Sequence, residues 1–327
     1  MEKRGIHIVA LMVIACLLPL FARSEFQLHV LVMVLLYALL AQGWNVMTGY
    51  TGLISIGQAA FFGFGAYVSS LLFVRWGINP WLGMLLAAFL TSLFSMIVFY
   101  PVTRLKGRYF AIATIAVSQG LKVLFENWEF VEAARGLAHP IVPEGFWAFQ
   151  FHSSKLPYYY ILLALVSLIT LALYFLENSR LGYYFQAIRE NEDVASAMGI
   201  NKTKYKLISV AISGAITSIA GSFLAQYSLY VEPEYVFAHE ISVTTALTGI
   251  FGGIGHLAGP ILGSLILTPL SEYTRAWLGA GGTGIDMMIY GGFIVIICVV
   301  EPKGVVGLWG RIRERKVTGK NVAHLTG

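Results

Sequence analysis

Long apolar runs recur along this chain and constrain its fold more than any other feature. Eight runs, at residues 6–22, 27–47, 53–74, 80–102, 109–125, 156–176, 206–230 and 284–301, are of spanning length. As helices they match the hydrocarbon core of a bilayer, which is about 30 Å thick. The 327 residues are 57% hydrophobic and only 12% charged, so a soluble domain would lack polar surface. The sequence therefore predicts an all-α polytopic membrane protein.

A further apolar region, residues 241–271, is interrupted by Pro260 and six glycines. Divided at His256, it gives two segments of about 15 residues, each about 22 Å long as a helix. The region is therefore predicted to form a hairpin of two short or partly re-entrant helices, which brings the chain to about ten segments. Gly-broken segments of this kind often line a transport path. Close helix packing through small residues explains the glycines equally well.

The distribution of basic residues predicts the orientation of these segments. With the N-terminus in the cytoplasm and ten alternating segments, 16 of the 22 Lys and Arg residues lie inside. The opposite topology leaves only six inside. Both termini are therefore predicted to be cytoplasmic.

Motifs for nucleotide binding, metal binding and covalent catalysis are missing from the sequence. There is no G-x-x-x-x-G-K-[ST] loop, no His or Cys pair at metal-ligand spacing and no G-x-S-x-G elbow. Asp286 lies near the outer start of the last run, where it is either a functional carboxylate or a helix N-terminal charge. These observations predict a transport subunit without a cofactor of its own rather than an enzyme or a nucleic-acid-binding protein.

The segment Tyr183–Met198, between two membrane runs, has the pattern of an amphipathic helix of about four turns. Gly199 is a natural left-handed stop for it. Such a helix either docks in a groove of a soluble partner or rests on lipid headgroups. Three acidic residues among positions 190–193 favour docking.

Six blocks of sequence then resemble one family in a single register over about residues 30–310. They are Leu39–Asn45, Gly49–Tyr67, Gly107–Thr114, Ala187–Asn201, Gly252–Gly263 and Pro302–Leu308. Together they are similar to the LivM-type permease of branched-chain amino acid ABC importers. Similar permeases often have His in place of Gln58, and the external stretch Val131–Leu137 also departs from the family pattern. The cargo is therefore left open between branched-chain or other amino acids, urea or short amides, and aromatic acids.

The resemblance implies a single permease domain over 1–310 with a coupling helix at about 183–199, and a basic cytoplasmic tail over 311–327. It implies a second, LivH-like permease subunit, two ABC ATPase subunits that hold ATP-Mg, an extracytoplasmic binding protein, and a bacterial inner membrane. The residues expected to contact the ATPase are Ile188, Arg189, Glu190, Asn191, Glu192, Asp193, Ala195, Met198 and Gly199. The competing classes are a self-contained secondary carrier and a passive channel.

Polar residues within the apolar runs are the candidates for the substrate path. They are Gln42, Asn45, Ser55, Gln58, Thr114, Ser118, Gln119 and His256. A buried polar group without a partner costs about 1–3 kcal/mol, so each needs a helix neighbour or a hydrated cavity. Both explanations stay open at this point, and His256 either contacts cargo or caps a broken helix.

Overall fold

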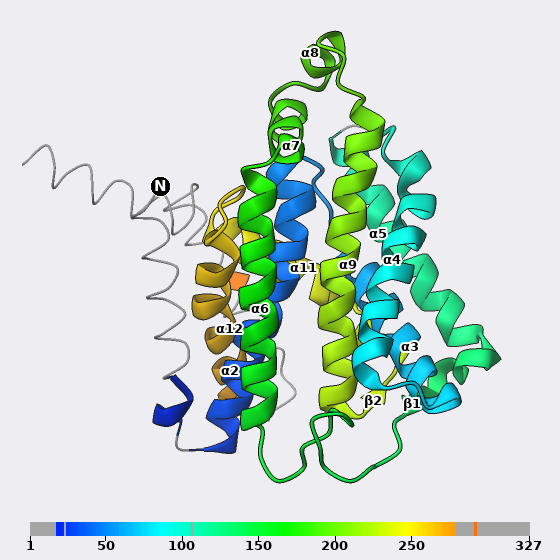
Figure 1. Cartoon of the computed structure of the whole chain (residues 1–327), viewed down its shortest axis with the longest axis vertical. Coiled ribbons are helices and arrows are strands. Elements are labelled where there is room, and N and C mark those ends of the chain that lie inside the picture. Colours follow the sequence, from blue (N-terminus) through cyan, green and yellow to red (C-terminus); the bar gives the residue numbers. More distant parts are fainter. Residues whose placement is uncertain (1–17, 23, 106, 279–290, 293–327) are drawn as a thin grey trace, which may run out of the picture.

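The computed structural model describes residues 18–22, 24–105, 107–278 and 291–292, and most of them are helical (Figure 1). Among these described residues, six helices are long and apolar enough to cross a membrane by length and composition. They are α2 (Glu25–Asn45, extended to Tyr50 by η2), α3 (Gln58–Trp76), α4 (Pro80–Val102), α5 (Arg108–Asn127), α6 (Leu156–Glu177) and α9 (Lys202–Ser228). They correspond to six of the predicted runs, and the runs at 6–22 and 284–301 lie almost entirely outside the described residues.

Shorter elements lie at the two ends of these helices. One end carries α7 (Arg180–Glu190) and α8 (Glu192–Ala197), and the other carries the strands β1 (Leu137–Ala138) and β2 (Tyr230–Val231) (Figure 1). The strands pair antiparallel, with Leu137 opposite Val231. The remaining short elements are η1 (Leu18–Phe21), η3 (Glu129–Val131), η4 (Ala133–Arg135) and α10 (Pro233–Val236). Which end faces the cytoplasm stays a prediction from the basic residues.

The predicted hairpin at 241–271 is formed by α11 (His239–Gly252) and α12 (Gly259–Leu278). Its turn contains His256, where the sequence predicts the division. The expectation of two equally short segments is wrong for α12, which has 20 residues against 14 in α11. The helix continues beyond 271 because its polar last turns satisfy their own groups: Thr274 donates to Leu270 O, and Glu272 pairs with Arg275.

The start of the third span also differs from the prediction. The apolar run begins at residue 53, but α3 begins at Gln58. Before it, α2 ends in the π-helix η2 (Val46–Tyr50), and a non-helical segment follows. This segment is held by the indole of Trp44, whose Nε1 donates to Ser55 O at 2.7 Å, and Gly52 supplies a left-handed residue with φ of 74°.

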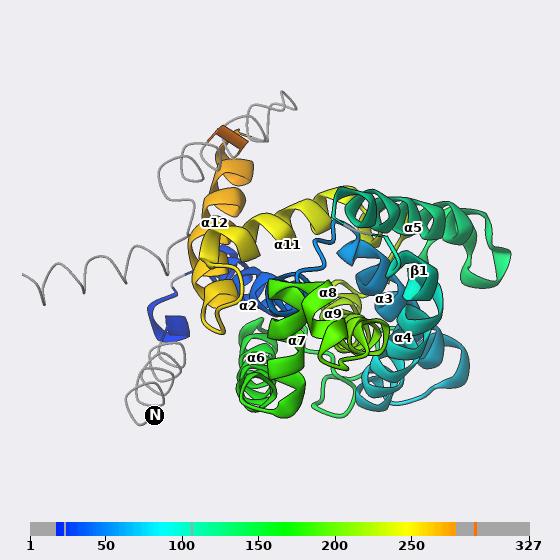
Figure 2. The same cartoon turned by 90° about the horizontal axis from the view of Figure 1, so that it is seen from above.

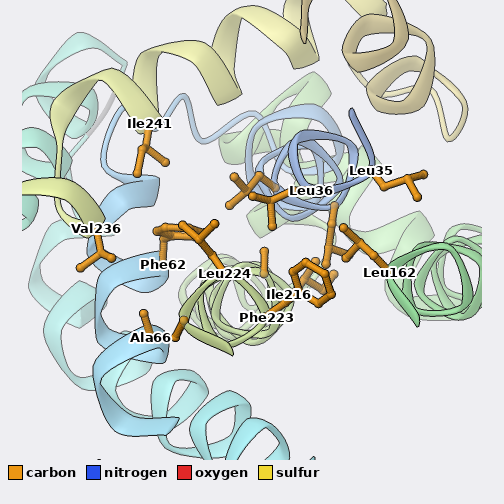
Figure 3. Packing of buried hydrophobic residues seen from close by; sticks show 14 of the residues in the cluster. Leu35, Leu36, Phe62, Ala66, Leu162, Ile216, Phe223, Leu224, Val236 and Ile241 are labelled. Carbon is orange, nitrogen blue, oxygen red and sulfur yellow. The ribbon is translucent and has the colours of Figure 1, made fainter. Parts of the chain in front are cut away.

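The core lies around α9. Buried side chains of α2, α3, α6 and α9 meet there, as the labelled side chains in Figure 3 show. Viewed from above, α9 lies between α6 and α3, and α11 runs along the side of α2 and α3 away from α6 and α4 (Figure 2). The contact between α3 and α9 is close, since a Cβ added at Gly221 would lie 2.1 Å from Phe62 O. Small residues therefore set the helix spacing here, as is common between membrane helices.

Candidate functional site

The predicted amphipathic helix is two helices, because the chain breaks at Asn191. Asn191 has extended backbone angles (φ −160°, ψ 111°), and its Oδ1 accepts from the backbone N–H groups of Asp193 and Val194 at 3.0 and 3.1 Å. Asn is a strong N-cap residue, so the Asn191 side chain stabilises the start of α8, and α7 ends before it. The prediction of one continuous helix is wrong, while Gly199 is left-handed as expected, with φ of 84°.

The apolar residues of this region face in two directions. Ile188 and Ala195 are 1% and 2% exposed, buried within the chain itself, so their predicted role as an apolar seat for an ATPase stays a prediction. By contrast, Tyr183, Val194 and Met198 are 62%, 55% and 77% exposed. The outward surface of α7 and α8 is therefore formed by these three side chains, together with exposed Gln186, Arg189, Glu190, Asn191, Asp193, Ser196 and Ala197.

Two ion pairs attach α8 to the start of α9. Lys206 Nζ lies 2.5 Å from Glu192 Oε1, and the Lys206 side chain is 3% exposed. Lys202 Nζ lies 3.3 Å from Asp193 Oδ1 in a more exposed position. Glu192 therefore has a partner within the chain, although the sequence predicts it as an ATPase contact.

Arg189 also has a partner within the chain. Its Nη1 donates to the carbonyl oxygen of Gly49 at 2.6 Å. Gly49 belongs to η2, so this bond joins α7 to the end of α2. Arg189 and Gly49 are 140 positions apart in the sequence, and no local pattern predicts their contact.

Asn45 and His256, two of the predicted path residues, meet in the same region. Asn45 Nδ2 donates to His256 O at 3.1 Å, and Asn45 Oδ1 accepts from Gly255 N at 2.8 Å. The His256 ring is exposed, and its Nδ1 lies 3.3 Å from Ile254 O. Ser55 lies nearby in the chain and is buried, with its Oγ accepting from Gly57 N at 3.2 Å. These residues organise the turns between helices.

Two of the three glutamines on the candidate path, Gln58 and Gln42, are bonded to other helices. Gln58 Nε2 donates to Ser213 Oγ at 3.2 Å, and Gln58 Oε1 accepts from Thr217 Oγ1 at 3.1 Å. Gln42 Nε2 donates to Thr170 Oγ1 at 2.6 Å, while Gln42 Oε1 is buried without a partner. Gln58 is thus satisfied by helix neighbours, and Gln42 only in part.

The three candidates on α5 also differ in whether their polar groups have hydrogen-bond partners. Thr114 Oγ1 accepts from Ile56 N at 3.0 Å and donates to Ala111 O at 2.7 Å. Ser118 is 1% exposed, and its hydroxyl has no partner. Gln119 is half-buried. Among the hydrogen bonds described for the eight predicted path residues, only that from Asn45 to His256 O joins two of them directly.

Sequence reasoning missed Ser213 and Thr217 as partners of Gln58, and Thr170 as the partner of Gln42. A signal was present for α9, where Ser209, Ser213 and Thr217 recur every four residues and so share one face. Within the described residues, no group of three or more His, Cys, Asp or Glu side chains is placed to hold a metal ion.

The helices define a multi-pass membrane protein, and comparison with known proteins gives its family. The family model described as the permease component of the branched-chain amino acid transport system matches residues 26–298, and the chain belongs to this family. It is similar to the high-affinity branched-chain amino acid transport system permease protein LivM of Salmonella typhimurium and of Escherichia coli K12. Each is 27% identical, over 93% of this chain and 75% of the relative.

The chain is also similar to the LivH permease protein of the same system in Escherichia coli K12. That relative is 26% identical over 83% of this chain and 91% of its own length. No solved structure matches the chain significantly. The comparisons therefore support a permease role and the LivM-type resemblance.

Proposed function

We propose that this chain is a transmembrane permease subunit of an ATP-driven importer for branched-chain or related amino acids in a bacterial inner membrane. An extracytoplasmic binding protein delivers the substrate, and the permease passes it across the membrane by alternating access. The observation that carries this proposal is the similarity to LivM permeases along 93% of the chain. Importers of urea, short amides or aromatic acids within the same family differ from it only in cargo.

The partners in this proposal are a LivH-like permease and two ABC ATPase subunits that bind ATP-Mg. The chain itself needs no cofactor. The outward surface of α7 and α8 is the proposed ATPase contact, because Tyr183, Val194 and Met198 are large apolar side chains exposed beside charged Glu190 and Asp193. Exposed apolar side chains rimmed by charge are typical of a docking surface.

The proposed substrate path lies within the permease domain at 1–310, with both termini and the tail at 311–327 in the cytoplasm. Gln42 and Ser118 are the first candidates to line it, because each has a buried polar atom without a partner. A buried polar group of this kind gains a partner when water or a polar substrate enters. Gln58 and Thr114 are instead assigned to helix packing.

Purification of the tagged chain from its native membrane in mild detergent tests this proposal. We expect a second permease and Walker-motif ATPases to be recovered with it by mass spectrometry. Met198→Asp should reduce recovery of the ATPases, because it places a charge in the apolar contact. Ile141→Asp is the matched control, since Ile141 is 80% exposed at the opposite end of the molecule. Recovery of the chain alone, with uptake that needs no ATP, would overturn the proposal.

A further inference from the structure

Arg189 is an exposed residue whose guanidinium reaches the end of α2. Its Nη1 donates to Gly49 O at 2.6 Å. Backbone carbonyls near a helix C-terminus carry partial negative charge and lack intrahelical donors, so a cation there is stabilised. A π-helix such as η2 is rare and often found at functional sites. The contact thus joins the α7 cation to an irregular end of a membrane helix.

Two glycines leave room for the Arg189 side chain. A Cβ added at Gly255 would lie 2.2 Å from Arg189 Nη1, and Gly255 has a left-handed φ of 76°. A Cβ added at Gly52 would lie 3.5 Å from Arg189 Cγ, against the side-chain stem. The guanidinium therefore lies between η2 and the turn that joins α11 to α12.

Asn45 holds that turn on the end of α2. Its amide donates to His256 O and accepts from Gly255 N, as described above. Both the amide nitrogen and the amide oxygen of Asn45 are thus hydrogen-bonded to the 253–258 turn. As a result, Arg189, η2 and the turn form one connected contact region, which we call the arginine junction (Asn45, Gly49, Arg189, Gly255 and His256).

The second short helix is attached elsewhere. Glu192 and Asp193 of α8 pair with Lys206 and Lys202 of α9, and the backbone breaks between the two attachments at Asn191. By contrast, α7 packs on α6, α9 and η2. Both halves of the α7–α8 unit therefore contact α9, and α7 also contacts the end of α2.

We propose that Arg189 is a positioning residue that couples displacement of α7 to η2 and the α11–α12 turn. This rests on the proposed function, in which an ATPase moves the α7–α8 unit. In this arrangement, a displacement of α7 is passed to η2 and to the α11–α12 turn through the arginine junction. Arg189 acts through the junction and does not contact the ATPase or the substrate.

Hydrogen exchange on the purified full chain in lipid nanodiscs tests the junction without any partner. Arg189→Met should make the amides of 253–257 exchange about tenfold faster, because the turn loses one of its attachments. Arg180→Met is the matched control: Arg180 is an exposed arginine on the same helix, and its loss should leave this exchange unchanged. Unchanged exchange in Arg189→Met would overturn the inference, whatever the outcome for the proposed function.

Transport by the reconstituted complex tests the coupling. Arg189→Met should keep ATPase recovery and ATP hydrolysis, while substrate uptake falls about tenfold. Gly255→Ala should act in the same direction, because its Cβ displaces the guanidinium. Gly77→Ala carries a similar left-handed strain, with φ of 62° and no atom within 4 Å of the added Cβ, and should keep uptake.

Two results of the transport measurement would overturn the inference. Loss of the ATPases from Arg189→Met, as expected for Met198→Asp, would make Arg189 a direct ATPase contact. Unchanged uptake per ATP in both Arg189→Met and Gly255→Ala would remove the coupling role. Failure of the wild-type chain to bring down any ATPase would instead defeat the proposed function, and the coupling with it, while the exchange experiment would still report on the junction itself.

Discussion

Gln58 shows how the partners of a polar residue decide its role. Taken alone, a glutamine in an apolar run beside a Gly-rich turn indicates a transport path. In the structure, its amide is bonded at both ends to hydroxyls of α9. Ser118 has the opposite surroundings, since it is equally buried and its hydroxyl is unpartnered. The two residues therefore make different predictions for stability and transport.

Gln58→Leu should lower the stability of the folded chain by about 1 kcal/mol, the scale measured for hydrogen bonds between membrane helices. Ser118→Ala should not lower it, because no hydrogen bond is lost, but should change uptake. Thermal unfolding in detergent, combined with uptake by the reconstituted complex, checks both variants. If the Gln58→Leu variant were as stable as the wild type but impaired in uptake, Gln58 would be assigned to the substrate path.

His139, in the loop between α5 and α6, is expected to make the stability of the fold sensitive to acid. It is 5% exposed, neither ring nitrogen has a partner, and burial lowers its pKa to about 4. The unfolded chain keeps a histidine pKa near 6.5 and so binds more protons between these two values. Stability should therefore be constant above about pH 6.5 and fall, by on the order of 3 kcal/mol in total, as the pH approaches 4.

His139→Phe should remove this part of the acid dependence, because Phe has no charge to gain and His139 already packs edge-on against Phe73. The measurement is the unfolding midpoint of both proteins from pH 4 to 8. Other groups titrate in both, so the difference between the two curves reports on His139. If the unfolding midpoints of the two proteins changed with pH in the same way, His139 would not be the source of the acid dependence.

For the secondary-structure elements, the sequence predicts which segments are helical better than it predicts where each helix begins and ends. The run at 80–102 coincides with α4, since Pro80 starts it and a long apolar stretch fills it. The break at Asn191 was not predicted because Ile188 and Ala195 keep the same apolar face on both sides of it. The contact of Gln42 with Thr170 spans 128 positions and depends on tertiary packing alone.

The attachment of α8 to α9 should depend on Lys206 far more than on Lys202. Lys206→Met leaves Glu192 without its buried partner, and breaking a buried pair costs about 3–5 kcal/mol. Lys202→Met removes a more exposed pair, worth about 1 kcal/mol or less. Hydrogen exchange over 192–198 should therefore be much faster in Lys206→Met only. Equal effects of the two variants would show that neither pair holds α8.

At the scale of the whole molecule, the chain is divided into two chemically different ends. The α7–α8 end carries Arg180, Arg189, Lys202, Lys204 and Lys206, and the opposite end carries the β1–β2 pair and the long loop before α6 (Figure 1). Basic residues concentrate on the cytoplasmic side of membrane proteins. We therefore predict that α7 and α8 lie on the cytoplasmic side.

Cysteine labelling in intact cells tests this orientation. In a chain with Cys16 and Cys298 replaced by Ser, Ser196→Cys should react with an impermeant thiol reagent only after the cytoplasmic side is opened. Ser154→Cys, in the loop at the other end, should react in intact cells. Ser196 is exposed and Ser154 is partly exposed. Reversed reactivity would invert the topology and move the proposed ATPase surface to the wrong side.

The central claim is that this chain moves substrate only as part of an ATP-driven complex. The most direct measurement is uptake of a labelled branched-chain amino acid into proteoliposomes, with the chain alone and with its co-purified partners. The account predicts uptake only for the complex, with ATP-Mg on the ATPase side and the binding protein on the other. Saturable or passive uptake by the chain alone, without ATP, would contradict it.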